Sequence, residues 1–311
     1  MNEVIKATAA APVATSSITV DWFQRFIDYV DASPKTLETY RKSIRRFMNW
    51  ISEHRVTQPQ RADILAYKQD LEAQYKNTTV QAYLEAVKLF FQWTAIEGLY
   101  PDIAKHIKGE KVDREHKKEY LTPDGVRRVL QGIDREKGAG LRDYAILVLM
   151  FTGGLRTVEV SRANVEDLGA VGGVPVLFVQ GKGYTDRREF VKLTPHTEAA
   201  IREYLKSRGP VKGSEPLFIS TSHNNAGGRL TTRSVSAIAK GAMVRAGYNS
   251  DKYTAHSTRH TAVTLALLAG KPLEEVQQFA RHANPATTLI YAHHLDKVKN
   301  SCAAAVEAAI F

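Results

Sequence analysis

The stretch His282-Ala283-Asn284-Pro285-Ala286-Thr287-Thr288-Leu289-Ile290-Tyr291 lies near the end of the chain and sets a histidine nine residues before a tyrosine. Asn284-Pro285 marks a turn, and proline suits the first position of a helix because the amide hydrogen it lacks is not needed there. The spacing therefore predicts a new helix that begins at Pro285 and carries Tyr291 about two turns in.

Two groups of residues earlier in the chain have basic side chains. His256-Ser257-Thr258-Arg259 places its histidine and its arginine three residues apart, so on a helix they share a face. Arg156 follows a Gly153-Gly154 turn, and Lys182 lies between two glycines. We expect these side chains and the late tyrosine to form one site.

Composition narrows the classes of function. The chain has 311 residues, with 43 Lys and Arg against 33 Asp and Glu, which gives a net charge of +10. Such a balance favours a nucleic-acid partner. The single cysteine, Cys302, excludes an internal disulfide and a cysteine-rich zinc site, and it favours a cytoplasmic location. The longest apolar run, Tyr144–Phe151, is too short to cross a bilayer, which needs about 20 residues.

Changes in composition divide the chain into four segments. Residues 1–17 are rich in Ala, Thr and Ser and predict a flexible arm, not a signal peptide. Residues 18–108 show only helical periods and predict a small helical bundle. Residues 109–119 (GEKVDREHKKE) are nearly all charged and predict a linker, and residues 120–311 predict a mixed α/β domain. The expected fold class is mainly α with a small β-sheet.

The helical half has clear start signals. Ser33-Pro34 predicts a helix with a serine cap, and further helices are expected from Arg61 to Gln74 and from near Thr78. Basic residues occupy the polar face of the Ser33-Pro34 helix, where they indicate either a solvated surface or a face that contacts DNA phosphates. The predicted DNA-contacting residues on this helix are Lys35, Arg41, Lys42 and Arg45.

The second half alternates helices with one hairpin. Val174–Val179 predicts a strand, Arg187–Leu193 its hairpin partner, and Gly181-Lys182-Gly183 begins the connection between them. Helix starts are expected at Thr122-Pro123, Thr194-Pro195 and Thr231-Thr232. Two apolar helical segments are expected between Ser257 and Phe279. A short apolar helix is expected at the C-terminus, where it either docks on another protomer or folds back on its own domain.

These residues suit attack on a phosphodiester. A tyrosine hydroxyl has a free pKa of about 10 and needs cationic neighbours to act as a nucleophile, the role expected for Tyr291. Negative charge builds on the non-bridging oxygens of the transition state, and Arg156 and Arg259 offer planar forks of donors that match them.

The other three residues would handle protons. Lys182, between two glycines, could reach in and protonate the leaving 5′ oxygen, and His256 and His282 could relay protons or bond the phosphate. The sequence has no carboxylate cluster, HExxH motif or cysteine pair, so we expect no metal or other cofactor. Each signal alone has an ordinary structural explanation, and the order of all six is what makes the pattern specific.

The series Thr152–Glu159, Gly181-Lys182-Gly183, His256–Thr261, Arg281-His282 and Tyr291 resembles the tyrosine recombinase (phage integrase) family, above all its compact Xer-like and transposon-integrase members. The resemblance covers nearly the whole chain after the arm, and it implies that residues 18–108 form a helical core-binding, DNA-binding domain and residues 120–311 the catalytic domain. It implies the catalytic roles given above for Arg156, Lys182, His256, Arg259, His282 and Tyr291, with Glu159 supporting the first arginine.

The resemblance also implies an assembly. Such enzymes close as a C-shaped clamp on double-stranded DNA, pair two recombination sites in a homotetramer and exchange strands through a Holliday junction, with the C-terminal helix packed on a neighbouring protomer. An accessory protein is an optional partner, and no membrane is involved.

Three positions depart from the family pattern. Gly153 stands where threonine is usual, Thr258 replaces a common leucine, and Ala280-Arg281-His282 replaces Leu-Gly-His. Arg281 adds bulk and charge beside the expected site, where it would contact DNA or tune the placement of Tyr291. Two other functions remain as alternatives: a type IB topoisomerase with the same chemistry, and a non-catalytic architectural DNA-binding protein.

Overall fold

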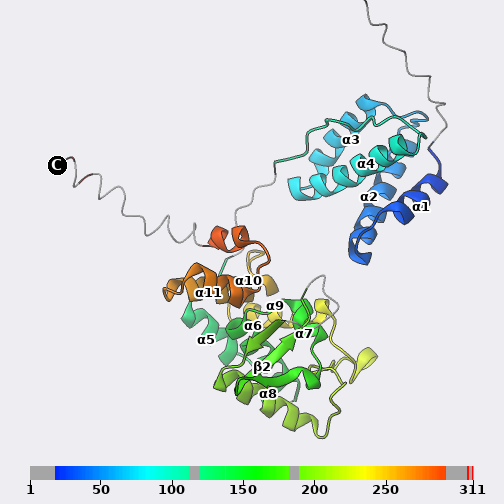
Figure 1. Cartoon of the computed structure of the whole chain (residues 1–311). Helices are drawn as coiled ribbons and strands as arrows, with labels where there is room; N and C mark the ends of the chain where they lie inside the picture. The colour runs from blue at the N-terminus through cyan, green and yellow to red at the C-terminus, as the bar shows by residue number, and fades with distance from the viewer. Residues whose placement is uncertain are drawn as a thin grey trace, which may run out of the picture. The chain divides into compact units, whose positions relative to one another are not determined.

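The computed structural model describes residues 18–111, 119–136, 138–181 and 189–291, together with Glu307 and Ile310. The chain divides into two compact units, Met1–Asp113 and Arg114–Phe311 (Figure 1). Each unit has an apolar core of its own, so each is described by itself.

The described part of the N-terminal unit is helical. Its second helix begins as the sequence predicts, because the Ser33 hydroxyl accepts a hydrogen bond from the Thr36 amide at 3.2 Å and Pro34 takes the first helical position. Aromatic rings fill the core, where Phe47 meets Tyr67 and Phe91 edge to face. The helices are α1 (Val20–Tyr29), α2 (Pro34–Glu53), α3 (Arg61–Gln74) and α4 (Asn77–Ile96).

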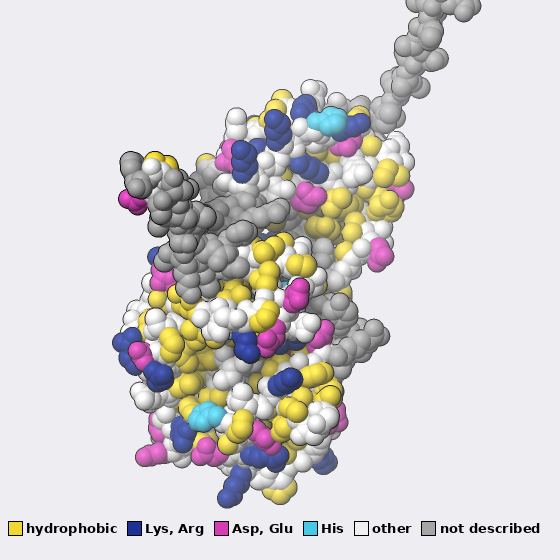
Figure 2. All heavy atoms as spheres, turned by 60° about the vertical axis from the view of Figure 1, so that its left-hand side comes forward, with side chains coloured by type: hydrophobic (Ala, Val, Ile, Leu, Met, Phe, Trp, Pro, Cys, Tyr) yellow, Lys and Arg dark blue, Asp and Glu magenta, His cyan; other side chains and the backbone are white. Residues whose placement is uncertain are grey.

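The polar face of α2 presents basic side chains to solvent. Arg46 is not one of them, because its guanidinium donates to the Gln74 side chain at 2.9 Å and lies over the ring of Tyr75. In Figure 2, Lys and Arg side chains recur across this unit with acidic side chains between them. The exposed basic residues on α2 are Lys35, Arg41, Lys42 and Arg45.

The C-terminal unit is built around α6 (Gly138–Gly153), whose apolar stretch is buried as predicted. This helix packs against α8 on one side and α10 on another, and Figure 1 shows the small sheet beside them. The other helices that the structure describes between residues 119 and 280 are α5 (Pro123–Gln131), α7 (Thr157–Arg162), η1 (Val165–Asp167), α8 (Pro195–Arg208), η2 (His223–Asn225), α9 (Thr232–Arg245), α10 (Ala255–Leu268) and α11 (Leu273–Ala280).

The sheet has three antiparallel strands in the order β1-β2-β3. The predicted hairpin is confirmed, since β2 (Val174–Val179) pairs with β3 (Glu189–Lys192) in a register that sets Leu177 opposite Val191. The sequence did not predict β1 (Leu168–Val171), which pairs with β2 on its other side. Because β1 is short, contains a glycine and has no buried residue, it lacks the alternation that marks a strand.

A tight turn at Gly153-Gly154 ends α6 and sets the direction of the next helix, α7. Gly154 has a φ of +59°, a left-handed conformation that glycine adopts without a steric penalty. Gly153 is also constrained, because a Cβ there would lie 2.6 Å from Val191 Cγ1 and 2.7 Å from Leu155 Cδ1. A threonine at position 153 would therefore force the side chains of Val191 and Leu155 to shift, so glycine suits the packing seen here. In the described part of the chain, every helix is too short or too polar to span a bilayer.

Candidate active site

Arg156 and Glu159 lie at the start of α7, directly after the glycine turn. The Glu159 carboxylate accepts a hydrogen bond from the Arg156 backbone N–H and another from its guanidinium, both at 2.8 Å. The Glu159 side chain is fully buried, whereas the Arg156 side chain is 29% exposed. The carboxylate therefore anchors Arg156 while leaving part of its guanidinium open to a ligand, which is the support that the i, i+3 spacing predicts.

Arg259 lies in α10 and is 1% exposed. Its guanidinium donates to the carbonyl oxygen of Gly154 at 2.5 Å and to that of Ala280. Burial, and then the charges of Arg156 and Arg281, lower the pKa of Arg259 to about 9, so it remains a cation at neutral pH. Arg259 thus joins the glycine turn to the end of α11.

Tyr291 belongs to a helix over residues 285–291, which begins at Pro285 as predicted. Asn284 caps this helix, since its side chain accepts the Ala286 N–H at 2.9 Å. The Tyr291 ring is 2% exposed and lies 4.8 Å from the His260 ring, centroid to centroid. Burial raises the pKa of Tyr291, while Arg259 and Arg156 act to lower it. In this state the phenol is shielded yet lies within the field of both arginines.

His282 connects α11 to the tyrosine helix. Its ring is stacked with the Tyr291 ring, with 6.1 Å between the two ring centroids, and its Nδ1 lies 2.9 Å from the hydroxyl of Thr288. Burial, followed by the charges of Arg259, Arg156, Arg281 and His256, lowers the pKa of His282 to about 4. Its imidazole is therefore neutral at pH 7 and available as a hydrogen-bonding group.

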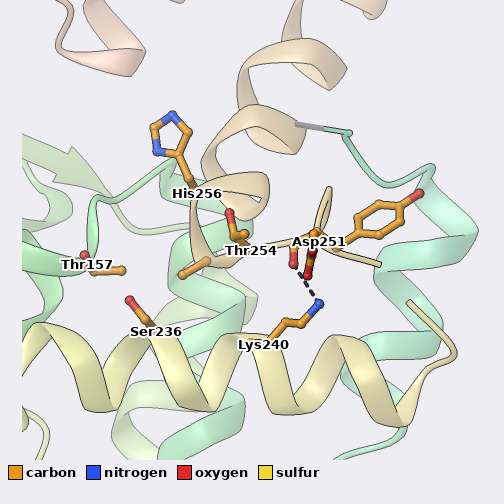
Figure 3. Close-up of a pocket in the computed structure, with 8 residues that line it drawn as sticks. Thr157, Ser236, Lys240, Asp251, Thr254 and His256 are labelled. Atoms are coloured by element: carbon orange, nitrogen blue, oxygen red, sulfur yellow. Dashed lines mark hydrogen bonds between the residues drawn. The ribbon is translucent and has the colours of Figure 1, made fainter. Parts of the chain in front are cut away.

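His256 stands at the beginning of α10 and is exposed. It lines a hollow of about 440 Å³ with Thr157 and with Ser236 and Lys240 of α9. Figure 3 shows the His256 ring pointing away from Lys240, whose ammonium donates to the backbone oxygens of Ser250 and Tyr253 at 2.8 and 3.0 Å. His256 is the last of the causes that lower the pKa of His282, so the two histidines lie close enough to interact electrostatically.

Arg281, predicted as a DNA-contacting residue, has a side chain that is only 5% exposed and binds protein groups. Its guanidinium donates to Glu159 at 2.8 Å, the same carboxylate that holds Arg156. Lys182 and, apart from Glu307 and Ile310, the tail after Tyr291, both predicted to be functional, lie outside the described residues.

Two contacts of the site were not predicted. Thr288 orients His282 and is fully buried, and His260 packs on Tyr291 while its Nδ1 lies 3.2 Å from the Thr264 hydroxyl. His260 directly follows Arg259 in the sequence, and that adjacency was the only available signal. Among the described residues, no group of three or more His, Cys, Asp or Glu side chains is placed to hold a metal ion.

The cluster has an excess of positive charge. Three guanidinium groups, from Arg156, Arg259 and Arg281, surround one carboxylate, that of Glu159, beside a buried phenol. A guanidinium has five N–H donors, and the 29% exposed side chain of Arg156 leaves donors that an anion can reach. Arg259, which is 1% exposed, adds its charge from inside the protein. Such an arrangement suits a phosphate diester that is attacked by tyrosine.

The chain thus has a helical unit followed by an α/β unit that brings arginines, a histidine and a tyrosine together. The family model described as "Phage integrase family" matches residues 119–297, and "Phage integrase, N-terminal SAM-like domain" matches residues 20–98. The chain belongs to the phage integrase family, the tyrosine recombinases.

Curated relatives and solved structures agree. Tyrosine recombinase XerC of Pelobacter propionicus is 28% identical over 266 residues, which cover 84% of this chain and 85% of the relative. Tyrosine recombinase XerA of Thermococcus kodakarensis is 28% identical over 272 residues, 88% of this chain and 89% of the relative. The structure of the XerH site-specific recombinase bound to palindromic difH substrate has a TM-score of 0.73 at 21% identity, covering 89% of this chain and 81% of that one.

Proposed function

We propose that this protein is a site-specific DNA recombinase that cuts and rejoins DNA through a 3′-phosphotyrosine intermediate on Tyr291. The observation that carries the proposal is the cluster of Arg156, Arg259, His282 and Tyr291, which come from separate segments of the C-terminal unit. Membership of the tyrosine recombinase family supports the same chemistry.

The reaction exchanges one phosphodiester for another. The Tyr291 oxygen attacks the scissile phosphorus and releases its proton. The bond from phosphorus to the 5′ oxygen breaks, that oxygen takes up a proton, and the 3′ end stays attached to the tyrosine through its phosphate. Attack by the 5′ hydroxyl of another strand then rejoins DNA and releases Tyr291. Because a phosphodiester bond is kept throughout, the reaction needs no ATP, and the arginines supply the positive charge at the phosphate that a metal ion would otherwise provide.

Each side chain has a role in this scheme. Arg156 and Arg259 bind the non-bridging oxygens and stabilise the charge that grows on them. His282, which is neutral at pH 7, offers a hydrogen bond to the phosphate, and the exposed His256 relays protons. Lys182 is proposed, from the family resemblance, to protonate the leaving 5′ oxygen.

DNA binding would involve both units. In the N-terminal unit, Lys35 and Lys42 of α2 line a hollow of about 380 Å³ that α4 completes, and Glu38, which also lines it, pairs with Lys35 at 2.7 Å. Hydroxyl side chains from both helices line it beside the two lysines, and such groups commonly bond DNA phosphates. The hydroxyl and lysine residues are Lys35, Thr39, Lys42, Ser43, Thr78, Thr79 and Tyr83.

We also propose the family's mode of assembly. Two recombination sites on double-stranded DNA would be paired by a homotetramer in the cytoplasm, with strand exchange through a Holliday junction and the C-terminal segment docked on a neighbour. A solved structure of similar fold is a lambda integrase tetramer bound to a Holliday junction, with a TM-score of 0.66 at 15% identity. An accessory protein is an optional further partner.

Neither alternative is favoured. A type IB topoisomerase shares the tyrosine chemistry, but the N-terminal SAM-like match and the recombinase relatives favour recombination. An architectural DNA-binding protein would not need arginines and a buried tyrosine held together in one site.

The proposal is tested by covalent capture. The protein is incubated in EDTA with sheared DNA from its source, denatured, and the attached DNA is sequenced, with Tyr291→Phe in parallel. We expect an adduct enriched in one sequence that the variant does not form. Two copies of that sequence on one plasmid should then recombine; relaxation of the plasmid without recombination would favour the topoisomerase.

A further inference from the structure

Arg281 occupies a backbone position that normally requires glycine. It follows α11 with a φ of 52° and a ψ of 48°, which is the left-handed region. Its N–H bonds the Gln278 carbonyl at 2.9 Å and the next N–H, that of His282, bonds the Gln277 carbonyl at 3.2 Å, so the helix ends in a Schellman motif. Because a side chain is disfavoured here, an arginine is expected to make compensating contacts.

The guanidinium of Arg281 makes those contacts inside the protein. One of its terminal nitrogens donates to Glu159 at 2.8 Å and to the carbonyl of Gly154 at 3.2 Å. The other donates to the carbonyls of Phe279 at 2.9 Å and Gly153 at 3.3 Å. Arg281 therefore ties the end of α11 to both the glycine turn and the first turn of α7.

These contacts close a ring that contains Arg156. One oxygen of Glu159 accepts the Arg156 guanidinium, and the other accepts Arg281 and the Arg156 backbone N–H. Arg156 in turn donates to the backbone carbonyl of Arg281 at 3.0 Å. A glycine at position 281 would keep that carbonyl but would leave the second oxygen of Glu159 without a side-chain donor, next to a buried space.

We propose that Arg281 is a positioning residue, which holds Arg156 in its phosphate-binding orientation by sharing the Glu159 carboxylate. The inference rests on the proposed function, because it assigns Arg156 to the scissile phosphate. With glycine at position 281, Arg156 would be the only arginine bonded to Glu159 among these contacts. In this chain Arg156 and Arg281 both bind the Glu159 carboxylate, and Arg281 supplies a charged contact between the end of α11 and α7.

The test uses Arg281→Gly, which suits the left-handed backbone, and Arg281→Lys, which keeps the charge without the fork. DNA captured by the wild-type protein is the substrate, and single-turnover adduct formation is measured at saturating protein, alongside DNA affinity. We expect Arg281→Gly to fold and to bind DNA like the wild type but to cleave about 10-fold to 100-fold more slowly. Arg281→Lys should recover part of the rate.

Arg208→Ala is the matched control. Arg208 is also a buried arginine that binds a glutamate, Glu215, and backbone carbonyls, but it lies at the end of α8. Its loss should lower stability without changing the cleavage rate at a temperature where the protein is folded.

Two further readouts separate positioning from a merely structural role. Guanidinium chloride at millimolar concentration should accelerate Arg281→Gly by filling the space beside Glu159, while sodium chloride at equal ionic strength should not. Burial opposes ionisation of Glu159, but Arg281 and Arg156, the cations that bond it, lower its pKa, and Arg259 of α10 interacts with the same carboxylate. Without Arg281 the pKa of Glu159 rises, and so does the pKa of His282, which Arg281 also lowers. The acidic limb of the pH–rate profile should therefore move to higher pH, which reports the loss of the Arg281 charge, while rescue by guanidinium reports the contact with Glu159.

The outcomes are distinct. A wild-type protein that forms no adduct would contradict the proposed function, whatever the variants do. A wild-type adduct with an equal rate for Arg281→Gly would overturn the positioning role and leave the function intact. A slow Arg281→Gly with no guanidinium rescue and an unshifted acidic limb would also overturn it, because the loss would then be structural.

Discussion

Acidification should destabilise the C-terminal unit through His282. The pKa of this histidine is lowered from 6.5 to about 4, chiefly by burial. Between those values the unfolded chain binds a proton that the folded protein does not, so stability is fully present above pH 6.5 and falls as the pH drops toward 4. One pH unit corresponds to about 1.4 kcal/mol, so a change from pH 7.5 to pH 5.0 should remove about 2 kcal/mol.

The assay compares the wild-type protein with His282→Gln by urea denaturation at both pH values. All three tryptophans, Trp22, Trp50 and Trp93, lie in the N-terminal unit, so their fluorescence reports that unit, while far-UV circular dichroism also follows the second. Other groups titrate equally in both proteins, so the wild type should lose about 2 kcal/mol more than the variant. Equal losses of unfolding free energy, or a larger loss in the variant, would refute a buried neutral His282. As a control, the fluorescence transition should not differ between the two proteins.

Three further predictions follow from the site and its surroundings. Arg259→Lys keeps the charge but not the fork that reaches Gly154 and Ala280, so adduct formation in a single-turnover assay should fall by about 100-fold or more without loss of folding. Gly153→Thr restores the usual family residue but brings a Cβ within 2.6 Å of Val191 Cγ1, so urea denaturation should show a loss of about 1–3 kcal/mol. DNA affinity from filter binding should fall linearly on a log–log plot against salt concentration, and a flat plot would contradict phosphate contacts as the main source of affinity.

The sequence predicted much of this fold because its helix starts carry local chemistry. Ser33, Thr122 and Thr194 each precede a proline, and each hydroxyl accepts the backbone N–H three residues later. Such signals need no tertiary information. The strand β1 was missed because it is held by pairing with β2, and its own residues show no pattern.

The candidate site was predicted from the order of its residues, but its electrostatics could not be. No sequence pattern indicates that Arg281 turns inward to Glu159, since that contact depends on how α11 packs on the glycine turn. The burial of Tyr291 against His260 likewise comes from the packing of the helix over residues 285–291 on α10. The departure at position 281 was visible in the sequence, and only the left-handed backbone explains why glycine is usual there.

The most direct test of the central claim is to identify the atom that carries the DNA. The covalent adduct, formed in EDTA, is digested with nuclease and protease, and the modified peptide is sequenced by mass spectrometry. We predict a nucleotide on the Tyr291 oxygen through its 3′ phosphate, with a free 5′ hydroxyl on the other side of the break. A nucleotide on another residue, or a 5′-phosphate linkage, would contradict the account.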